Sequence, residues 1–174
     1  CRVIDRPMRP LFPKDYRNDV TLENLVMCVD QDCSPELTAM LGSALATCIS
    51  DIPFDGPTAA TQIGLVEGEL VVNPTSEQRQ VSDLALTVAS TREKVIMIEA
   101  GANEVPEDLM IEAIYKAHEV NGQIIEFFDK IVAECGKEKH EYEHFDIPED
   151  MYEDMVSFVT PEAMEEAVFT DVKQ

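Results

Sequence analysis

The residues with the clearest chemical potential are three arginines near the start of the chain, Arg2, Arg6 and Arg9. Their spacing places them on one face of a helical turn. A guanidinium is planar, permanently charged and able to hold two oxygens of one phosphate, so this pattern favours a surface that tracks phosphates. The alternative is that nearby carboxylates neutralise them in exposed ion pairs worth about 0–1 kcal/mol each. The candidate carboxylates are Asp5, Asp15 and Asp19.

The distribution of charge strengthens the phosphate interpretation. The chain has 35 acidic and 13 basic residues and a formal net charge of −22, yet five of the basic residues lie within its first seventeen positions. No Lys or Arg occurs from Asn18 to Gln78. An acidic surface repels the nucleic-acid backbone, so any contact with nucleic acid must be local. Elsewhere the acidity indicates a solvated surface.

No other pattern predicts a catalytic or metal site. Cys28 and Cys33 have no partner pair at zinc-ligand spacing, and we expect them to be core or turn thiols. His118 has no nucleophile at triad-like spacing. The chain contains no phosphate-binding glycine loop and no nucleophile-elbow motif. We therefore assign no catalytic residue and no metal ligand.

Bulk properties indicate one domain with an appendage. The 174 residues are 45% hydrophobic, which is sufficient for a real core. No apolar run is long enough to span a membrane, and no apolar signal segment opens the chain. Five irregularly spaced cysteines favour a reducing compartment, and we expect a cytoplasmic protein. Because the first residue is Cys, we expect an excised fragment.

Hydrophobic patterns predict an α+β fold, with a mostly antiparallel sheet covered by helices on one face. The first seventeen residues predict a short helical turn that prolines break. A strand is predicted over Val20–Val29, then a helix capped by Ser34, with Pro35 in its first turn. The remaining strands are predicted over Thr58–Val66, Glu69–Val72, Leu84–Ala89 and Val95–Ile98, with a hairpin turn at Glu67-Gly68.

Helices dominate the C-terminal half. A long helix is predicted from Pro106 towards Cys135, with a possible bend at Asn121-Gly122. Two further helices are predicted after Pro148 and after Thr160, which has the features of a helix cap. The domain boundaries we expect are 1–140 for the α+β core, 141–147 for a linker and 148–174 for the beginning of an all-helical domain.

Several long runs closely resemble the first RNase PH-like core of bacterial polynucleotide phosphorylases, in the order of that family. The runs are Arg2–Pro13, Ser50–Pro57, Val72–Thr75, Glu99–Ala102 and Val132–Lys137. The resemblance covers residues 1 to about 140, and the remainder resembles the beginning of that family's all-helical domain.

The resemblance implies a function. The family degrades RNA from 3′ to 5′ by phosphorolysis: inorganic phosphate attacks the terminal linkage and releases nucleoside diphosphates, with magnesium assisting. It further implies a homotrimeric ring, single-stranded RNA as partner, and positions for Arg2, Arg6 and Arg9 along the RNA path. The family's chemistry depends on placing and neutralising phosphates.

The chain departs from the active copies of this core. Leu37 occupies the position of a phosphate-binding arginine, and Arg79, Ala85 and Thr87 stand where metal-binding and catalytic groups are expected. The resemblance thus implies a core that is catalytically silent, with magnesium bound by the other core of the intact enzyme. Two alternatives remain: a free-standing RNase PH-type enzyme, and an acidic protein–protein scaffold without an RNA role.

Overall fold

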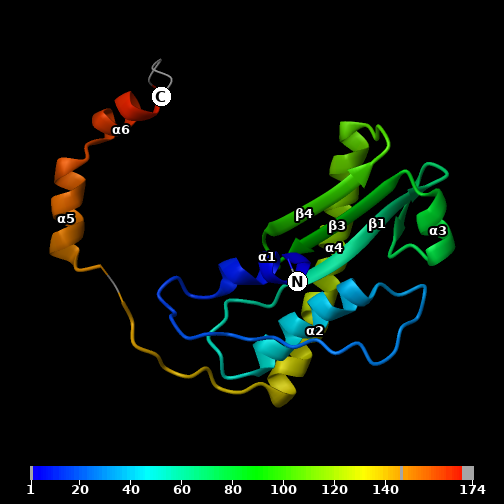
Figure 1. Cartoon of the computed structure of the whole chain (residues 1–174), viewed down its shortest axis with the longest axis horizontal. Coiled ribbons are helices and arrows are strands. Elements are labelled where there is room, and N and C mark those ends of the chain that lie inside the picture. The colour runs from blue at the N-terminus through cyan, green and yellow to red at the C-terminus, as the bar shows by residue number, and fades with distance from the viewer. Residues whose placement is uncertain (1, 146, 170–174) are drawn as a thin grey trace. The chain divides into compact units, whose positions relative to one another are not determined.

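The computed structural model describes residues 2–145 and 147–169, so Cys1 and the C-terminal end of the predicted all-helical segment lie outside the described residues. Helices and strands alternate irregularly along the chain (Figure 1). They are α1 (Arg2–Met8), a 3₁₀ turn η1 (Arg9–Leu11), α2 (Pro35–Ile49), β1 (Ala59–Val66), β2 (Glu69–Val72), α3 (Ser76–Val81), β3 (Leu84–Ser90), β4 (Val95–Ala102), α4 (Glu107–Cys135), α5 (Glu149–Phe158) and α6 (Pro161–Val168).

The sheet has four strands in the order β2-β1-β3-β4, and every neighbouring pair is antiparallel. The predicted hairpin between β1 and β2 is confirmed. Glu67 and Gly68 both have positive φ, at 52° and 83°, which is the backbone of a type I′ turn. Such a turn matches the twist of the flanking strands and fixes the register Val66↔Glu69.

Helices contact both faces of this sheet, which corrects the expectation that they cover only one. Alternate residues of a strand point to opposite faces. Ile63 and Leu86, which are paired across β1 and β3, pack against Ala113 and Ala117 of α4. Ala60 belongs to the opposite face and packs with Met40 of α2 and with α1. The α+β class and the antiparallel sheet are confirmed.

The predicted cap of α2 is confirmed in detail. The Ser34 hydroxyl accepts a hydrogen bond from the backbone N–H of Leu37, at 3.3 Å, and Pro35 lies in the first turn. Proline is tolerated there because the first N–H groups of a helix have no intrahelical partner. Met40 and Ala44 are among the residues that this helix buries.

The strand predicted over Val20–Val29 is wrong. These residues belong to no strand or helix, and within the described chain their backbone groups make no hydrogen bond to another backbone group. Leu25 and Met27 are 81% and 89% exposed. An isolated strand gains neither ladder hydrogen bonds nor burial, so apolar composition alone does not form one.

Helix α4 runs unbroken for 29 residues, through the Asn121-Gly122 pair at which the sequence suggests a bend. Asn121 is fully buried and lies against the sheet. Its Oδ1 accepts from the Thr61 hydroxyl at 2.7 Å, and its Nδ2 donates to the Val88 carbonyl and the Ser90 hydroxyl. The residue that suggested a turn instead satisfies buried polar groups of two strands.

The chain divides into two compact units, of which the first ends at Tyr142 and the second begins at Glu143. The second contains α5 and α6, and both predicted helices are confirmed. Thr160 caps α6 by accepting from the backbone N–H of Ala163. Among the described residues, no helix combines the length and apolar character that crossing a membrane requires.

Candidate nucleic-acid interface

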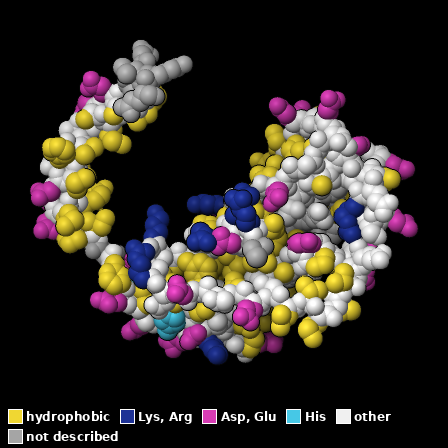
Figure 2. Space-filling view, in the orientation of Figure 1, with side chains coloured by type: hydrophobic (Ala, Val, Ile, Leu, Met, Phe, Trp, Pro, Cys, Tyr) yellow, Lys and Arg dark blue, Asp and Glu magenta, His cyan; other side chains and the backbone are white. Residues whose placement is uncertain are grey.

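Helix α1 presents its arginines to solvent because its opposite side is apolar. Pro7 and Met8 are buried, and Ile4 packs against both the α2 cluster and the cluster around Phe54. Arg2, Arg6 and the following Arg9 are exposed. In Figure 2, dark blue side chains gather over α1 and the loop that follows it. We call Arg2, Arg6 and Arg9 the arginine strip.

The members of the arginine strip are not equivalent. Arg9 forms a two-point ion pair with Asp5, in which Nε and Nη2 lie 3.1 and 2.6 Å from the two carboxylate oxygens. Within the described chain, neither Arg2 nor Arg6 forms an ion pair. The competing interpretation, that carboxylates neutralise the strip, therefore applies to Arg9 alone.

The loop after the strip is held against the C-terminal end of the first unit. The Tyr16 hydroxyl lies 3.2 Å from Nε2 of His140, and its ring meets the edge of Tyr142 at a centroid distance of 5.1 Å. The Tyr142 hydroxyl donates to Asp15. These contacts tie the start of the chain to residues more than 120 positions away.

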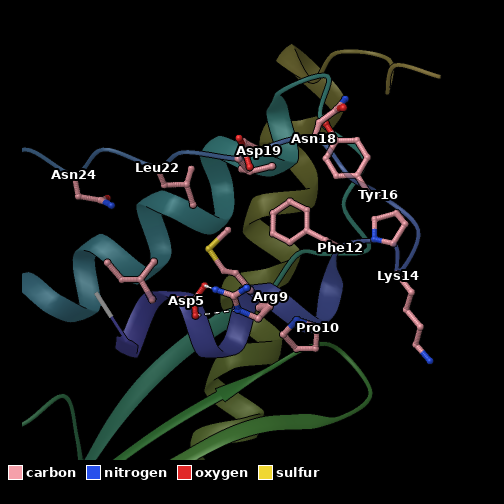
Figure 3. A pocket seen from close by; sticks show the side chains of 14 residues that line it. Asp5, Arg9, Pro10, Phe12, Lys14, Tyr16, Asn18, Asp19, Leu22 and Asn24 are labelled. Carbon is pink, nitrogen blue, oxygen red and sulfur yellow. Dashed lines mark hydrogen bonds and ion pairs between the residues drawn. The ribbon is translucent and has the colours of Figure 1, made fainter. Parts of the chain in front are cut away.

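A cavity of about 980 Å³ lies between α1 and residues 12–24 (Figure 3). Its apolar floor includes Met8 and Phe12, and Arg9 and Lys14 lie at its lining together with Tyr16. This volume lies at the upper end of the range typical of small-molecule sites. The sequence pattern gave no sign of this cavity, because it depends on how an irregular segment passes over a helix.

The positions expected to hold metal in active copies cannot do so here. The Arg79 guanidinium already donates to the carbonyls of Pro74 and Gln31, at 2.6 and 2.5 Å. Ala85 and Thr87 lie on β3, where Thr87 pairs with Gln62. Magnesium requires several oxygen ligands, mainly carboxylates and waters, and a guanidinium repels it. These residues do not fit a magnesium ion.

Leu37 likewise serves packing. It lies in the first turn of α2 and contacts the cluster of Met40, Ala60 and Ala89. An apolar side chain has no donor for a phosphate oxygen. Within the parts of the chain that the structure describes, no three His, Cys, Asp or Glu side chains form a group that could hold a metal ion.

Asp32, a carboxylate near Arg79, has a structural role that the sequence interpretation missed. Asp32 accepts from both the backbone N–H and the hydroxyl of Ser76, at 2.8 and 2.9 Å, at the start of α3. These bonds, backbone first, hold the pKa of Asp32 below its usual value, with a further contribution from Arg79. Helix α3 itself was not predicted, although Thr75 and Gln78 form the reciprocal hydrogen bonds of a capping box, a recognisable sequence signature.

The cysteines match the prediction only in part. Cys28 and Cys33 are free and exposed, so neither is a core thiol, but Cys33 lies in a turn, where its backbone N–H donates to the Asp30 carbonyl; Cys135 is exposed as well. Cys48 is buried in the cluster with Met8 and Phe54. Burial raises the pKa of the Cys48 thiol to about 11, which makes it an inert core group. Cys1 lies outside the described residues.

Lys139 is a second structural residue that sequence reasoning did not single out. Its ammonium donates to the carbonyls of Thr47, Cys48 and Ser50, at 3.1, 2.9 and 2.7 Å. These carbonyls lie at the C-terminal end of α2, where a cation is favourable. The backbone N–H of His140 also donates to the carbonyl of Asp51, so the segment after α4 is fixed along this end of α2.

Comparisons with known proteins place this geometry in a family. The family model described as "3′ exoribonuclease family, domain 2" matches residues 56–120. The crystal structure of rice (Oryza sativa) Rrp46 is similar with a TM-score of 0.54 and 16% identity, covering 60% of this chain and 51% of that one. At that identity the likeness shows the fold alone. The fold is thus RNase PH-like.

Sequence relatives are far more similar. Polyribonucleotide nucleotidyltransferases from Lachnoclostridium phytofermentans, Ruminiclostridium cellulolyticum and Clostridioides difficile are 76%, 54% and 50% identical over 99%, 90% and 97% of this chain. The chain spans 25%, 22% and 24% of their lengths. It belongs to the polyribonucleotide nucleotidyltransferase family and corresponds to about a quarter of those proteins.

Proposed function

We propose that this chain is the part of a 3′-to-5′ phosphorolytic exoribonuclease that guides single-stranded RNA and does not itself break bonds. The identity with polyribonucleotide nucleotidyltransferases over nearly the whole chain supports the reaction class. The exposed arginine strip on an otherwise acidic protein is the observation that supports the guiding role.

The proposed reaction takes place elsewhere in the whole enzyme. Inorganic phosphate attacks the terminal phosphorus of the RNA, the bond to the 3′ oxygen of the preceding nucleotide breaks, and a nucleoside diphosphate leaves. Magnesium would be bound by another core, because Arg79, Ala85 and Thr87 do not fit it. Leu37 in place of a phosphate-binding side chain agrees with a silent core.

The proposed assembly follows from the same family. We propose a homotrimer in the cytoplasm, built from cores like this one, with the arginine strip lining the RNA path. The domain boundaries 1–140, 141–147 and 148–174 remain part of this proposal.

A charge-reversal experiment tests the guiding role. Changing Arg2, Arg6 and Arg9 together to Glu should greatly weaken binding of single-stranded RNA. It should also reduce the dependence of log K on log salt by about 1.4, since Arg2 and Arg6 are the members of the strip without an ion pair in the described chain and each lost phosphate contact on a single strand removes ~0.7. The matched control reverses three exposed lysines, Lys94, Lys130 and Lys137, with the same change in net charge. Equal weakening by both triple variants would show that only overall charge matters, and unchanged affinity would favour the scaffold alternative.

A phosphorolysis assay tests the silent core. Incubation of the chain with oligoadenylate, phosphate and magnesium should release no nucleoside diphosphate. Release of nucleoside diphosphate that depends on phosphate would establish the free-standing enzyme instead.

A further inference from the structure

We propose that the cavity beside α1 receives a nucleobase of the RNA strand whose phosphates the arginine strip holds. This inference rests on the proposed function and adds a second recognition element to it. The cavity adjoins the strip, because Arg9 belongs to both (Figure 3). A strand that passes over α1 can therefore place a base in the cavity while its phosphates remain on the arginines.

The cavity contains aromatic rings that are already held in place. Phe12 packs against Phe54 at a centroid distance of 5.0 Å, and Tyr16 is held by His140 and Tyr142. Both rings line the cavity. Every base has an aromatic face, so such rings provide sequence-tolerant stacking, and a ring fixed beforehand loses little freedom when a base arrives.

Side-chain amides provide the polar contacts that a base edge needs. Asn18 and Asn24 both line the cavity. The Asn24 Oδ1 accepts from the Ser43 hydroxyl, which leaves its Nδ2 donors available, and Asn18 makes no side-chain hydrogen bond within the described residues. An amide offers both donors and an acceptor, as the Watson–Crick edges of bases do.

The charges of the cavity favour a base over a phosphate. Asp5 and Asp19 line it together with Arg9 and Lys14. Asp5 already occupies one edge of the Arg9 guanidinium. A phosphate inside the cavity would meet two carboxylates, whereas a neutral base carries no charge for them to repel. The free cations of the strip, Arg2 and Arg6, lie on α1 and suit the phosphates better.

Two oligomers of equal length and charge separate base binding from phosphate binding. Oligoadenylate should bind the full 174-residue chain about tenfold more tightly than an abasic ribose-phosphate oligomer, as expected for stacking of a base. A 2-aminopurine placed within the oligoadenylate should lose fluorescence on binding. Equal affinity for the two oligomers would overturn this inference alone. If neither oligomer bound, the proposed function would be overturned with it.

Variants assign the base preference to the cavity. Tyr16→Ala and Asn18→Ala should each remove most of the oligoadenylate advantage and leave affinity for the abasic oligomer unchanged. Tyr16→Phe keeps the ring and should retain the advantage. Arg6→Ala should weaken both oligomers by the same factor. Because Asn18 is exposed, its variant tests the inference even if Tyr16→Ala does not fold, and a retained preference in Asn18→Ala and Tyr16→Ala would overturn it.

Discussion

Asp5 lies one helical turn before Arg9, and both of its carboxylate oxygens contact that guanidinium, at 2.6 and 3.1 Å. The pair lies on the face of α1 that carries Arg2 and Arg6. A carboxylate at this place lowers the positive charge available to a phosphate chain and occupies the planar edge of one arginine. Asp5 thus reduces what Arg9, one of the three arginines of the strip, can offer to a phosphate.

Replacement of this carboxylate should strengthen RNA binding. Asp5→Asn frees Arg9 and removes one negative charge, so affinity for single-stranded RNA should rise and the salt dependence should steepen by ~0.7. Stability should change by less than about 1 kcal/mol, because the pair is exposed. Filter binding across a salt series measures the slope. Asp108→Asn, at an exposed position in the first turn of α4, controls for the change in net charge. A fall in affinity would mean that Asp5 orients Arg9 for phosphate.

The buried amide of α4 should matter much more for stability. Asn121→Ala leaves the Val88 carbonyl and the hydroxyls of Thr61 and Ser90 without this partner in the core. Leaving buried polar groups unpaired costs about 1–3 kcal/mol each at most sites, so we expect a loss of at least ~2 kcal/mol. Urea denaturation followed by circular dichroism measures it. Gln123→Ala, two residues further along the same helix and exposed, should have little effect.

The ammonium of Lys139 should stabilise the first unit although its side chain is attached to an irregular segment. Lys139→Met keeps the aliphatic length and removes three charge-assisted hydrogen bonds to the end of α2. We expect a loss of about 1–3 kcal/mol in the free energy of unfolding. Lys137→Met is the matched control, because Lys137 donates to Ile49 only through its backbone N–H. Equal effects of the two changes would refute a specific role for the Lys139 side chain.

Acid should release the contact between the loop before α2 and the start of α3. The pKa of Asp32 is lowered in the folded chain, so its stabilising effect is fully present above the unfolded value, near 4, and disappears as pH falls through the lower folded value. NMR titration should find a midpoint below that of ordinary aspartates. Asp32→Asn should flatten the acid limb of the stability curve. A midpoint at or above 4 would exclude this contribution.

Local signals in the sequence predicted those elements whose ends are encoded by adjacent residues. The Glu67-Gly68 turn and the Ser34 cap are examples, since each needs only a few neighbouring residues to form. The strand prediction for Val20–Val29 was wrong because a strand depends on a partner strand that no local sequence pattern reveals. The hydrogen bonds of Asn121 could not be predicted for a related reason: its partners lie 31 to 60 positions away in the sequence.

The candidate site shows the same division. Arg2, Arg6 and Arg9 are readable as one face because a helix fixes their spacing, and the structure does place them together in the first turns of the chain. Asp5 is one of three carboxylates proposed to neutralise the arginines, and its position four residues before Arg9 on a helical turn explains the pairing. The cavity between α1 and Tyr16 does not follow from helical spacing, because it arises from an irregular segment anchored by residues near position 140.

The uncovered stretch around Leu25 and Met27 has a colloidal consequence. Peptide groups without ladder partners, flanked by exposed apolar side chains, are a template on which another chain can add edge to edge. Mutual repulsion between molecules of net charge −22 opposes that addition. Salt shortens the range of this repulsion to about 10 Å at 0.1 M. Raising the ionic strength should therefore lower the protein concentration at which the isolated polypeptide begins to aggregate.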